Sequence, residues 1–259
     1  MYNQINLFDL PHTLYILISF ALSAVGLVLL ARFCKTQKNK DSVLKIFALL
    51  TVAIHYSDLW VNYLKNGSTT IENNQLFAVY PCNVMMWLLL ITAFWKKKNS
   101  VSYTLLTEST FWVGSICGIA GILFNPNYSN NPNLLEYGIL QGLVSHSTMV
   151  FGCIWILIGG YIRIRVFNAV SAACCLLLFF VDGIFINTLF DLCNLPPVNS
   201  MFLQQLPFPS LPFLNPIAFG IVILLVFFGA LALYEWKAFP PEERWYAKLK
   251  KHGKTPQEE

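Results

Sequence analysis

Residues 76–95 read LFAVYPCNVMMWLLLITAFW, and three lysines follow at positions 96–98. The stretch is long enough to cross a hydrocarbon core of about 30 Å as a helix. It carries Pro81, Cys82 and Asn83 within its apolar length. Polar groups are costly inside a membrane unless they face the interior of a bundle and find partners. We therefore expect Cys82 to lie at the centre of a buried polar site that the rest of the chain surrounds.

The composition is that of an integral membrane protein. Of the 259 residues, 56% are hydrophobic and 12% are charged, with a mean hydropathy of +0.57. A soluble domain carries roughly 25% charged residues. Five of the seven cysteines lie inside apolar runs, so they indicate small buried side chains and not a disulfide framework. The net charge of +4 lies in a few loops, which argues against a nucleic-acid partner.

The chain is expected to be all-α and polytopic, with one bundle over residues 1–236 and a charged tail over 237–259. The amino terminus lacks the positive region of a cleaved signal peptide, so the first helix is expected to stay. Each apolar run has the length that a membrane helix needs. The seven predicted spans are 14–33, 43–64, 76–95, 102–124, 138–162, 167–190 and 214–236. The segment 240–251, PPEERWYAKLKK, is either a helix on the membrane surface or a solvated anchor.

The basic residues predict the orientation. With these spans, 16 of the 17 lysines and arginines lie on one side, and Lys65 alone lies on the other. Cytoplasmic loops carry the excess of basic residues. We therefore predict the amino terminus outside and the carboxyl terminus in the cytoplasm.

The few polar residues of the spans lie at a common depth. At about 1.5 Å per residue, five of them fall roughly 9–14 Å below the outer surface, on four different helices: His55, Asp58, Cys82, His146 and Asp182. Glu108 lies nearer the cytoplasm. We interpret the group as a polar pocket in the outer half of the bundle. Each member also has a structural interpretation: a His55–Asp58 pair that orders packing, a satisfied buried His146, a helix-break cap at Asp182, and Asn83 and Asn187 as interhelical hydrogen bonds.

These residue types can support acyl chemistry. A thiol is a strong nucleophile once a nearby imidazole removes its proton. Cys82 would attack an ester or thioester carbonyl, and His146 would act as the base. Asp182 or Asp58 would orient the imidazole, and Asn83 could donate a hydrogen bond to the oxyanion. At this depth the accessible substrate is the ester region of a lipid.

At these residues the chain resembles the YwaF-like integral membrane proteins of bacteria. The resemblance rests on Cys82-Asn83, on His146-Ser147 and on the region from Asn187 to Pro197. The third-span pattern of that family reads Leu-Pro-Leu-His-Leu-Cys-Asn, whereas residues 77–83 here read FAVYPCN. The Cys-Asn pair is kept, and Ala78 and Tyr80 stand at the proline and histidine positions. Tyr80 or His55 would then take the place of that histidine.

Eukaryotic relatives of the YwaF-like family include a membrane acyltransferase that makes polyunsaturated ether phospholipids through a cysteine nucleophile. The resemblance therefore implies a seven-span fold in a bacterial plasma membrane. It also implies a Cys82–His146 acyltransferase that takes a phospholipid or lysophospholipid and an acyl donor, without a cofactor.

Two other functions stay open at the level of the sequence. A zinc-dependent lipid hydrolase would draw its ligands from His55, His146, Asp58, Asp182 and Cys82, although no closely spaced ligand motif is present. A carrier, receptor or scaffold would use the polar cavity without catalysis. A scaffold would tolerate Cys82→Ser and His146→Ala, and an enzyme would not.

Overall fold

The structure is a computed structural model that describes residues 7–67, 77–205 and 216–247. Within these ranges all regular secondary structure is helical, which confirms the all-α prediction. Two short 3-10 helices, η1 (Ser200–Phe202) and η3 (Pro241–Glu243), follow α8 and α9. The α-helices are α1 (Leu10–Phe33), α2 (Gln37–Asn66), α4 (Pro81–Phe94), α5 (Val101–Leu123), α6 (Pro126–Asn130), α7 (Tyr137–Ile158), α8 (Asn168–Leu192) and α9 (Pro216–Ala238).

Among the described helices, α1, α2, α5, α7, α8 and α9 are long and apolar enough to cross a membrane. They follow the predicted spans with shifted ends. Helix α2 begins at Gln37, ahead of the predicted residue 43, because the Thr36 hydroxyl accepts a hydrogen bond from the Asn39 amide and caps the helix. Helix α7 ends at Ile158, ahead of the predicted residue 162. Gly160, which follows shortly after it, has a φ of 79°.

The third predicted span, residues 76–95, is shorter in the structure. Helix α4 begins at Pro81 and has 14 residues, which gives a length of about 21 Å. Proline suits the first position of a helix because its fixed φ is helical and the amide hydrogen it lacks would have no partner there. The described residues before it, 77–80, are not helical. The predicted span is therefore a 14-residue helix preceded by an irregular segment.

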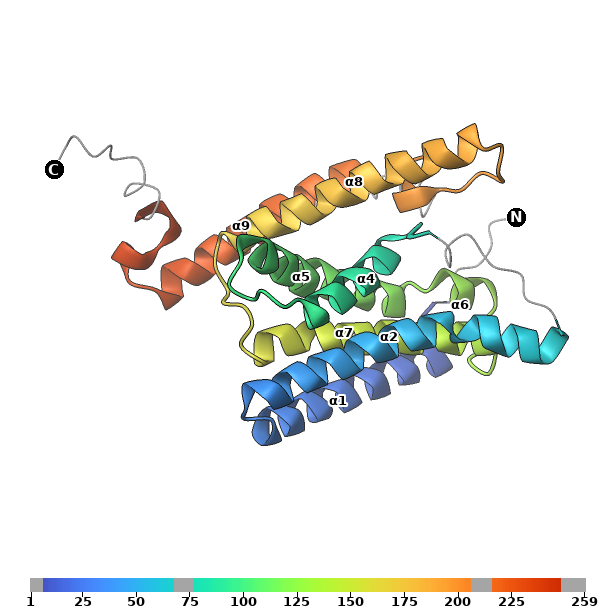
Figure 1. Ribbon diagram of the computed structural model, residues 1–259, viewed down its shortest axis with the longest axis horizontal. Helices are drawn as coiled ribbons and strands as arrows, with labels where there is room; N and C mark the ends of the chain where they lie inside the picture. The colour runs from blue at the N-terminus through green and yellow to red at the C-terminus, as the bar shows by residue number, and fades with distance from the viewer. Residues whose placement is uncertain (1–6, 68–76, 206–215, 248–259) are drawn as a thin grey trace.

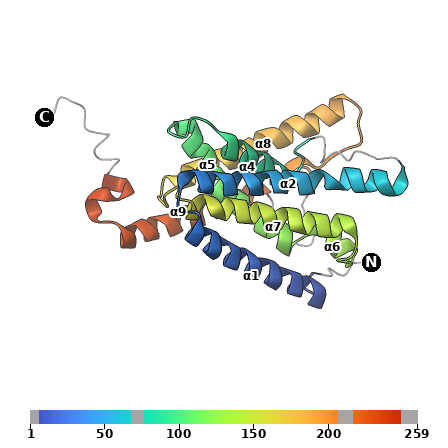
Figure 2. The same ribbon diagram turned by 60° about the horizontal axis from the view of Figure 1, so that its bottom comes forward.

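Helix α7 lies at the centre of the bundle. It packs against α1, α2, α4 and α5, and α4 and α5 also pack against each other. Figures 1 and 2 show α1 at one edge and α8 at the opposite edge, with α9 beside α8. Helix α8 contacts both α5 and α9. The core of the protein is consequently formed by α2, α4, α5 and α7.

Glycines bring α5 and α7 into close contact. A Cβ atom built on Gly114 would lie 2.7 Å from Cys153 Sγ, and one built on Gly118 would lie 2.5 Å from Val150 Cγ2. At Gly121 the added atom would overlap the ring of His146. Small residues at such spacing let membrane helices approach closely. This α5 face therefore fixes the depth and rotation of α7, including the position of His146.

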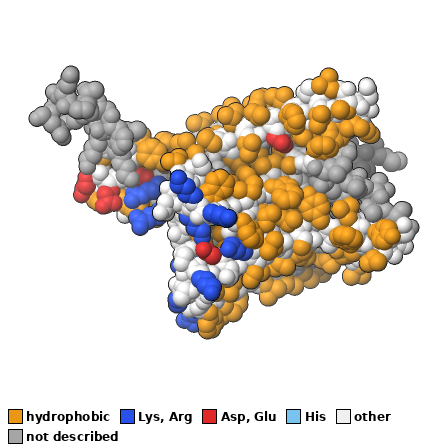
Figure 3. Space-filling model, viewed as in Figure 1, with side chains coloured by type: hydrophobic (Ala, Val, Ile, Leu, Met, Phe, Trp, Pro, Cys, Tyr) orange, Lys and Arg blue, Asp and Glu red, His pale blue; other side chains and the backbone are white. Residues whose placement is uncertain are grey.

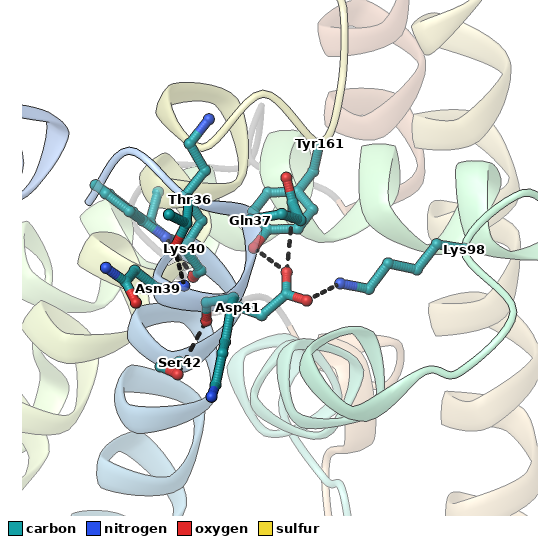
Figure 4. A network of polar contacts seen from close by, with 10 residues as sticks. Thr36, Gln37, Asn39, Lys40, Asp41, Ser42, Lys98 and Tyr161 are labelled. Carbon is teal, nitrogen blue, oxygen red and sulfur yellow. Dashed lines mark hydrogen bonds and ion pairs between the residues drawn. The ribbon is translucent and has the colours of Figure 1, made fainter.

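Basic side chains gather at one end of the molecule, which we call the basic end (Figure 3). There Asp41 at the start of α2 joins two other segments (Figure 4). Lys98 Nζ lies 2.6 Å from Asp41 Oδ2, and Tyr161 donates a hydrogen bond of 2.6 Å to Asp41 Oδ1. Gln37 donates to the same oxygen. Asp41 thus ties α2 to the α4–α5 and α7–α8 connections.

The chain after α9 folds back onto that helix. Glu235 is buried, and its two carboxylate oxygens accept hydrogen bonds from the backbone amides of Val166 and Trp245. The Trp245 ring packs edge-on against Phe228 of α9. The described part of the predicted tail, through residue 247, is therefore attached to the bundle. Residues 248–251 of the predicted surface segment lie outside the described residues.

Candidate functional site

Cys82 is the second residue of α4. Its half-buried side chain packs against the apolar core. Because Cys82 directly follows Pro81, the thiol belongs to the first turn of the helix. On α5, Cys117 packs against the same core cluster, which contains Cys153 and Cys175. The predicted nucleophile is therefore placed where the chain turns into a helix inside the bundle.

Asn83 connects α4 to α2. Its Oδ1 accepts a hydrogen bond from the Tyr80 amide at 3.2 Å, and its Nδ2 lies 3.1 Å from His55 Nε2. Because an amide nitrogen can only donate, His55 Nε2 is the acceptor, and its ring is neutral with the proton on Nδ1. Asn83 is buried. The residue next to Cys82 in the sequence thus fixes the tautomer of an imidazole on a neighbouring helix.

Gln141 on α7 supports the same histidine from the other side, and the sequence analysis missed it. Its Nε2 donates to the carbonyl oxygens of Ile54 and His55, at 2.8 and 2.6 Å. The sequence does contain a signal for this residue, because Gln141 is a carboxamide inside an apolar span and such groups form interhelical hydrogen bonds. The structure therefore joins α2, α4 and α7 around His55.

His146 occupies the interface between α5 and α7. Its Nδ1 lies 2.7 Å from the carbonyl oxygen of Gly142, so Nδ1 carries the proton and Nε2 carries the lone pair. The ring lies against Gly121. Gly121 and Cys117 are one turn apart on the same face of α5. Hydrogen bonds among the described residues do not join His146 to Cys82.

The two candidate orienting carboxylates have different surroundings. Asp58 accepts a hydrogen bond of 2.9 Å from Asn62, one turn further along α2. Asp182 Oδ2 is buried and has no hydrogen-bond partner among the described residues. Asp182 is seven residues from Cys175, whose thiol contacts Met85 Sδ at 3.5 Å, so it lies on the inward face of α8. The partner that orients His146 is a backbone carbonyl and not one of these acids.

Tyr80 and Asn187 shape the end of the bundle above α4. The exposed Tyr80 ring stacks on Phe202, with a centroid distance of 5.5 Å. Asn187 is buried, accepts from the Ser200 amide at 2.9 Å and donates to the Ser200 carbonyl. The Ser200 hydroxyl and the Met201 amide both bond to the carbonyl of Val79. The segment after α8 thereby covers the irregular residues that precede Cys82.

A second polar cluster, unforeseen from the sequence, lies at the amino-terminal end of α1. His12 is fully buried, stacks on Tyr128 and bonds through Nε2 to the carbonyl of Ile122 at 2.9 Å. Tyr128 donates to Asp9 Oδ1 at 2.6 Å, and this hydrogen bond lowers the pKa of Asp9. The cluster fastens α1 to α5 and α6.

The side chains proposed as zinc ligands are not brought together. Among residues 7–67, 77–205 and 216–247, no group of three His, Cys, Asp or Glu side chains is placed to hold a metal ion. Such a site needs three protein ligands around one point. The five side chains weighed as zinc ligands therefore do not form a ligand set in the described part of the chain.

Comparison with known families matches residues 7–234 to the TMEM164 family. The chain belongs to the TMEM164 family. No curated protein and no solved structure matches the chain. TMEM164 proteins are membrane proteins, so the match and the long apolar helices together make this chain an integral membrane protein. The expected YwaF-like relation and the lipid chemistry at Cys82 stay predictions for this TMEM164 protein.

Proposed function

We propose that this TMEM164-family protein is a membrane-embedded lipid acyltransferase that uses Cys82 as its nucleophile, or an acyl hydrolase where water is the acceptor. In this proposal α4 is the third of seven spans in a bacterial plasma membrane. The amino terminus lies outside and the carboxyl terminus in the cytoplasm. The gathering of basic side chains at one end supports this orientation.

The observation that carries the proposal is the position of Cys82 at the start of α4. Cys82 stands in the first turn of a 14-residue helix. The amino-terminal end of a helix stabilises negative charge, on a thiolate or on an oxyanion. The short helix also starts inside the bundle, so the thiol lies at a depth that suits lipid ester groups. The adjacent Asn83 is held by Tyr80 and His55 and can donate to the oxyanion if it exchanges partners.

His146 is the better candidate for the base. Asn83 occupies His55 Nε2, whereas the hydrogen bond from His146 Nδ1 to Gly142 leaves the His146 Nε2 lone pair as its basic site. Cys82 and Cys117 pack against the same core cluster, and His146 lies on Gly121, one turn from Cys117 on α5. We assign His55 to positioning, together with Asn83 and Gln141.

The reaction proceeds in two balanced steps. His146 takes the thiol proton, the Cys82 sulfur bonds to the ester carbonyl carbon, and the carbon–oxygen bond breaks as the proton passes to the leaving alcohol. An acyl thioester remains on Cys82. An acceptor hydroxyl then gives its proton to His146 and attacks the carbonyl, and the carbon–sulfur bond breaks to return the thiol. A lysophospholipid acceptor gives transfer, and water gives hydrolysis.

Labelling with an acyl-tailed chloroacetamide tests the proposal. The purified protein, in detergent with native lipid, is treated and examined by intact mass and peptide mapping. Wild type should be modified selectively at Cys82, and the rate should fall about tenfold or more in His146→Ala. Cys117→Ser is the matched control and should label normally. If Cys82 reacts no faster than Cys117 or Cys153, the nucleophile assignment is wrong.

One observation favours a second candidate without catalysis. Asn83, Asp58 and Asn187 all make hydrogen bonds that hold helices or caps in place. A polar-cavity carrier, receptor or scaffold would use them in this way. Such a protein would keep its cellular function in both Cys82→Ser and His146→Ala, whereas the acyltransferase would lose it in both.

A further inference from the structure

A cavity of about 320 Å³ opens on the surface of the bundle between α1, α2 and α7. We call it the α1 groove. The α1 side carries Tyr15, Ser19 and Ser23, and the α7 side carries Ser147 and Phe151. Ile18 and Leu22 lie at its edge and are 56% and 67% exposed. These large apolar side chains face the bilayer in a membrane protein, so the groove opens toward lipid.

The hydroxyl groups of Tyr15, Ser19, Ser147 and Thr148 are hydrogen-bonded to one another, to Thr51 or to backbone. Ser147 Oγ lies 2.9 Å from the Tyr15 hydroxyl and 2.8 Å from Ser19 Oγ, and it bonds to the carbonyl of Leu143. The rings of Phe47 and Phe151, which also line the groove, stack at 3.9 Å. No charged side chain lines the groove among the described residues. The walls therefore suit hydrocarbon and not a charged headgroup.

The size of the groove limits its occupant. Tyr15 and Ser23 lie about 12 Å apart along α1, and the groove has a volume of about 320 Å³. A helix segment of that length, about 10–12 Å wide with its side chains, would need roughly 1,000 Å³ and does not fit. A single linear chain does fit. We propose that the α1 groove binds one acyl chain of a membrane lipid.

The groove also runs past Ser147, the residue after His146. Tyr15 and Ser19 hold Ser147 on the α1 side of α7, while His146 faces α5. An acyl chain in the groove would therefore contact Ser147, which is the residue next to His146, the assigned base. The binding site itself goes beyond the thiol chemistry and does not depend on it.

Photo-crosslinking tests the assignment without any activity assay. The full-length protein is placed in phosphatidylcholine vesicles that contain a phosphatidylcholine with a diazirine on one acyl chain, and adducts are mapped by peptide mass spectrometry after illumination. The adducts should concentrate in the peptides around Tyr15–Ser23 and Val144–Phe151. Ser23→Phe fills the groove and should reduce these adducts about fivefold or more, which corresponds to about 1 kcal/mol.

Ala21→Phe is the matched control, because Ala21 is exposed on the opposite face of α1. It adds the same ring and should leave the groove adducts unchanged. Ile18→Trp, at the edge of the groove, is a second blocking variant in case Ser23→Phe does not fold. The proposal is wrong if adducts spread evenly over α1, α8 and α9, if neither blocking variant lowers the yield, or if illumination yields mainly crosslinked dimers. The chloroacetamide labelling of Cys82 is also measured in Ser23→Phe. This measurement separates a failure of the α1-groove proposal from a failure of the thiol proposal.

Discussion

At the scale of single residues, Asn83 forms more hydrogen bonds than the sequence indicated. A Cys-Asn pair predicted an oxyanion donor, and the structure adds a cap on Tyr80 and a bond to His55. Depth along a span follows from the helical rise, so the sequence predicts a similar level for His55 and His146. The same count does not hold for Cys82, because residues 77–80 before its helix are not helical. Rotation of each helix depends on which neighbours it packs against. For that reason the sequence could not show that Asn83 meets His55 and that His146 faces Gly121.

We predict that Asn83→Ala lowers the free energy of unfolding by about 1–3 kcal/mol, because it leaves the Tyr80 amide and His55 Nε2 without this partner in a buried site. The measurement is denaturant-induced unfolding in mixed micelles. Asn62→Ala is the matched control. It removes one i,i+4 hydrogen bond to Asp58 and should cost about 0.5 kcal/mol or less. Equal losses in the two variants would contradict the linking role of Asn83.

At the scale of helices, the apolar runs predicted most of the elements and Pro81 changed one of them. The run 76–95 has the length of a span, but proline favours the first position of a helix and Asn83 caps the turn that follows. The apolar residues before Pro81 could therefore belong to the membrane span only as non-helical backbone. The segment after α8 supplies their partners, since Ser200 and Met201 bond to Val79. Such a long-range pairing has no local sequence signal.

The contact between α5 and α7 yields a prediction at this scale. Gly118→Ala should lower the free energy of unfolding by about 1–3 kcal/mol, because the new methyl group would lie 2.5 Å from Val150 Cγ2 and 3.2 Å from Met149 Cε. Gly229→Ala in α9 is the control, since nothing lies within 4 Å of its added methyl group. It should be neutral or stabilise by up to about 1 kcal/mol. Thermal unfolding in detergent compares the two, and similar changes would show that the glycine face is not a close contact.

At the scale of the whole molecule, charge and hydropathy predicted an all-helical membrane protein, and the structure and family confirm it. The basic end is also a structural unit that composition could not show. Asp41 joins Lys98 and Tyr161, and Glu235 joins Val166 and Trp245. These bonds connect residues far apart in the sequence. The count of basic residues predicts the topology, and that topology depends on whether the 14-residue α4 crosses the membrane.

Three cysteine positions decide the topology. In a background without the other cysteines, Phe8→Cys, the native Cys193 and Ala238→Cys are labelled singly with an impermeant maleimide, before and after permeabilisation of the cells. All three positions are exposed. Seven spans with the amino terminus outside predict labelling of Phe8→Cys and Cys193 in intact cells, because α9 separates Cys193 from residue 238. Ala238→Cys should react only after permeabilisation.

If Phe8→Cys behaves like Ala238→Cys, the number of crossings is even and α4 does not span. If all three patterns are reversed, the count of seven stands and the orientation is wrong.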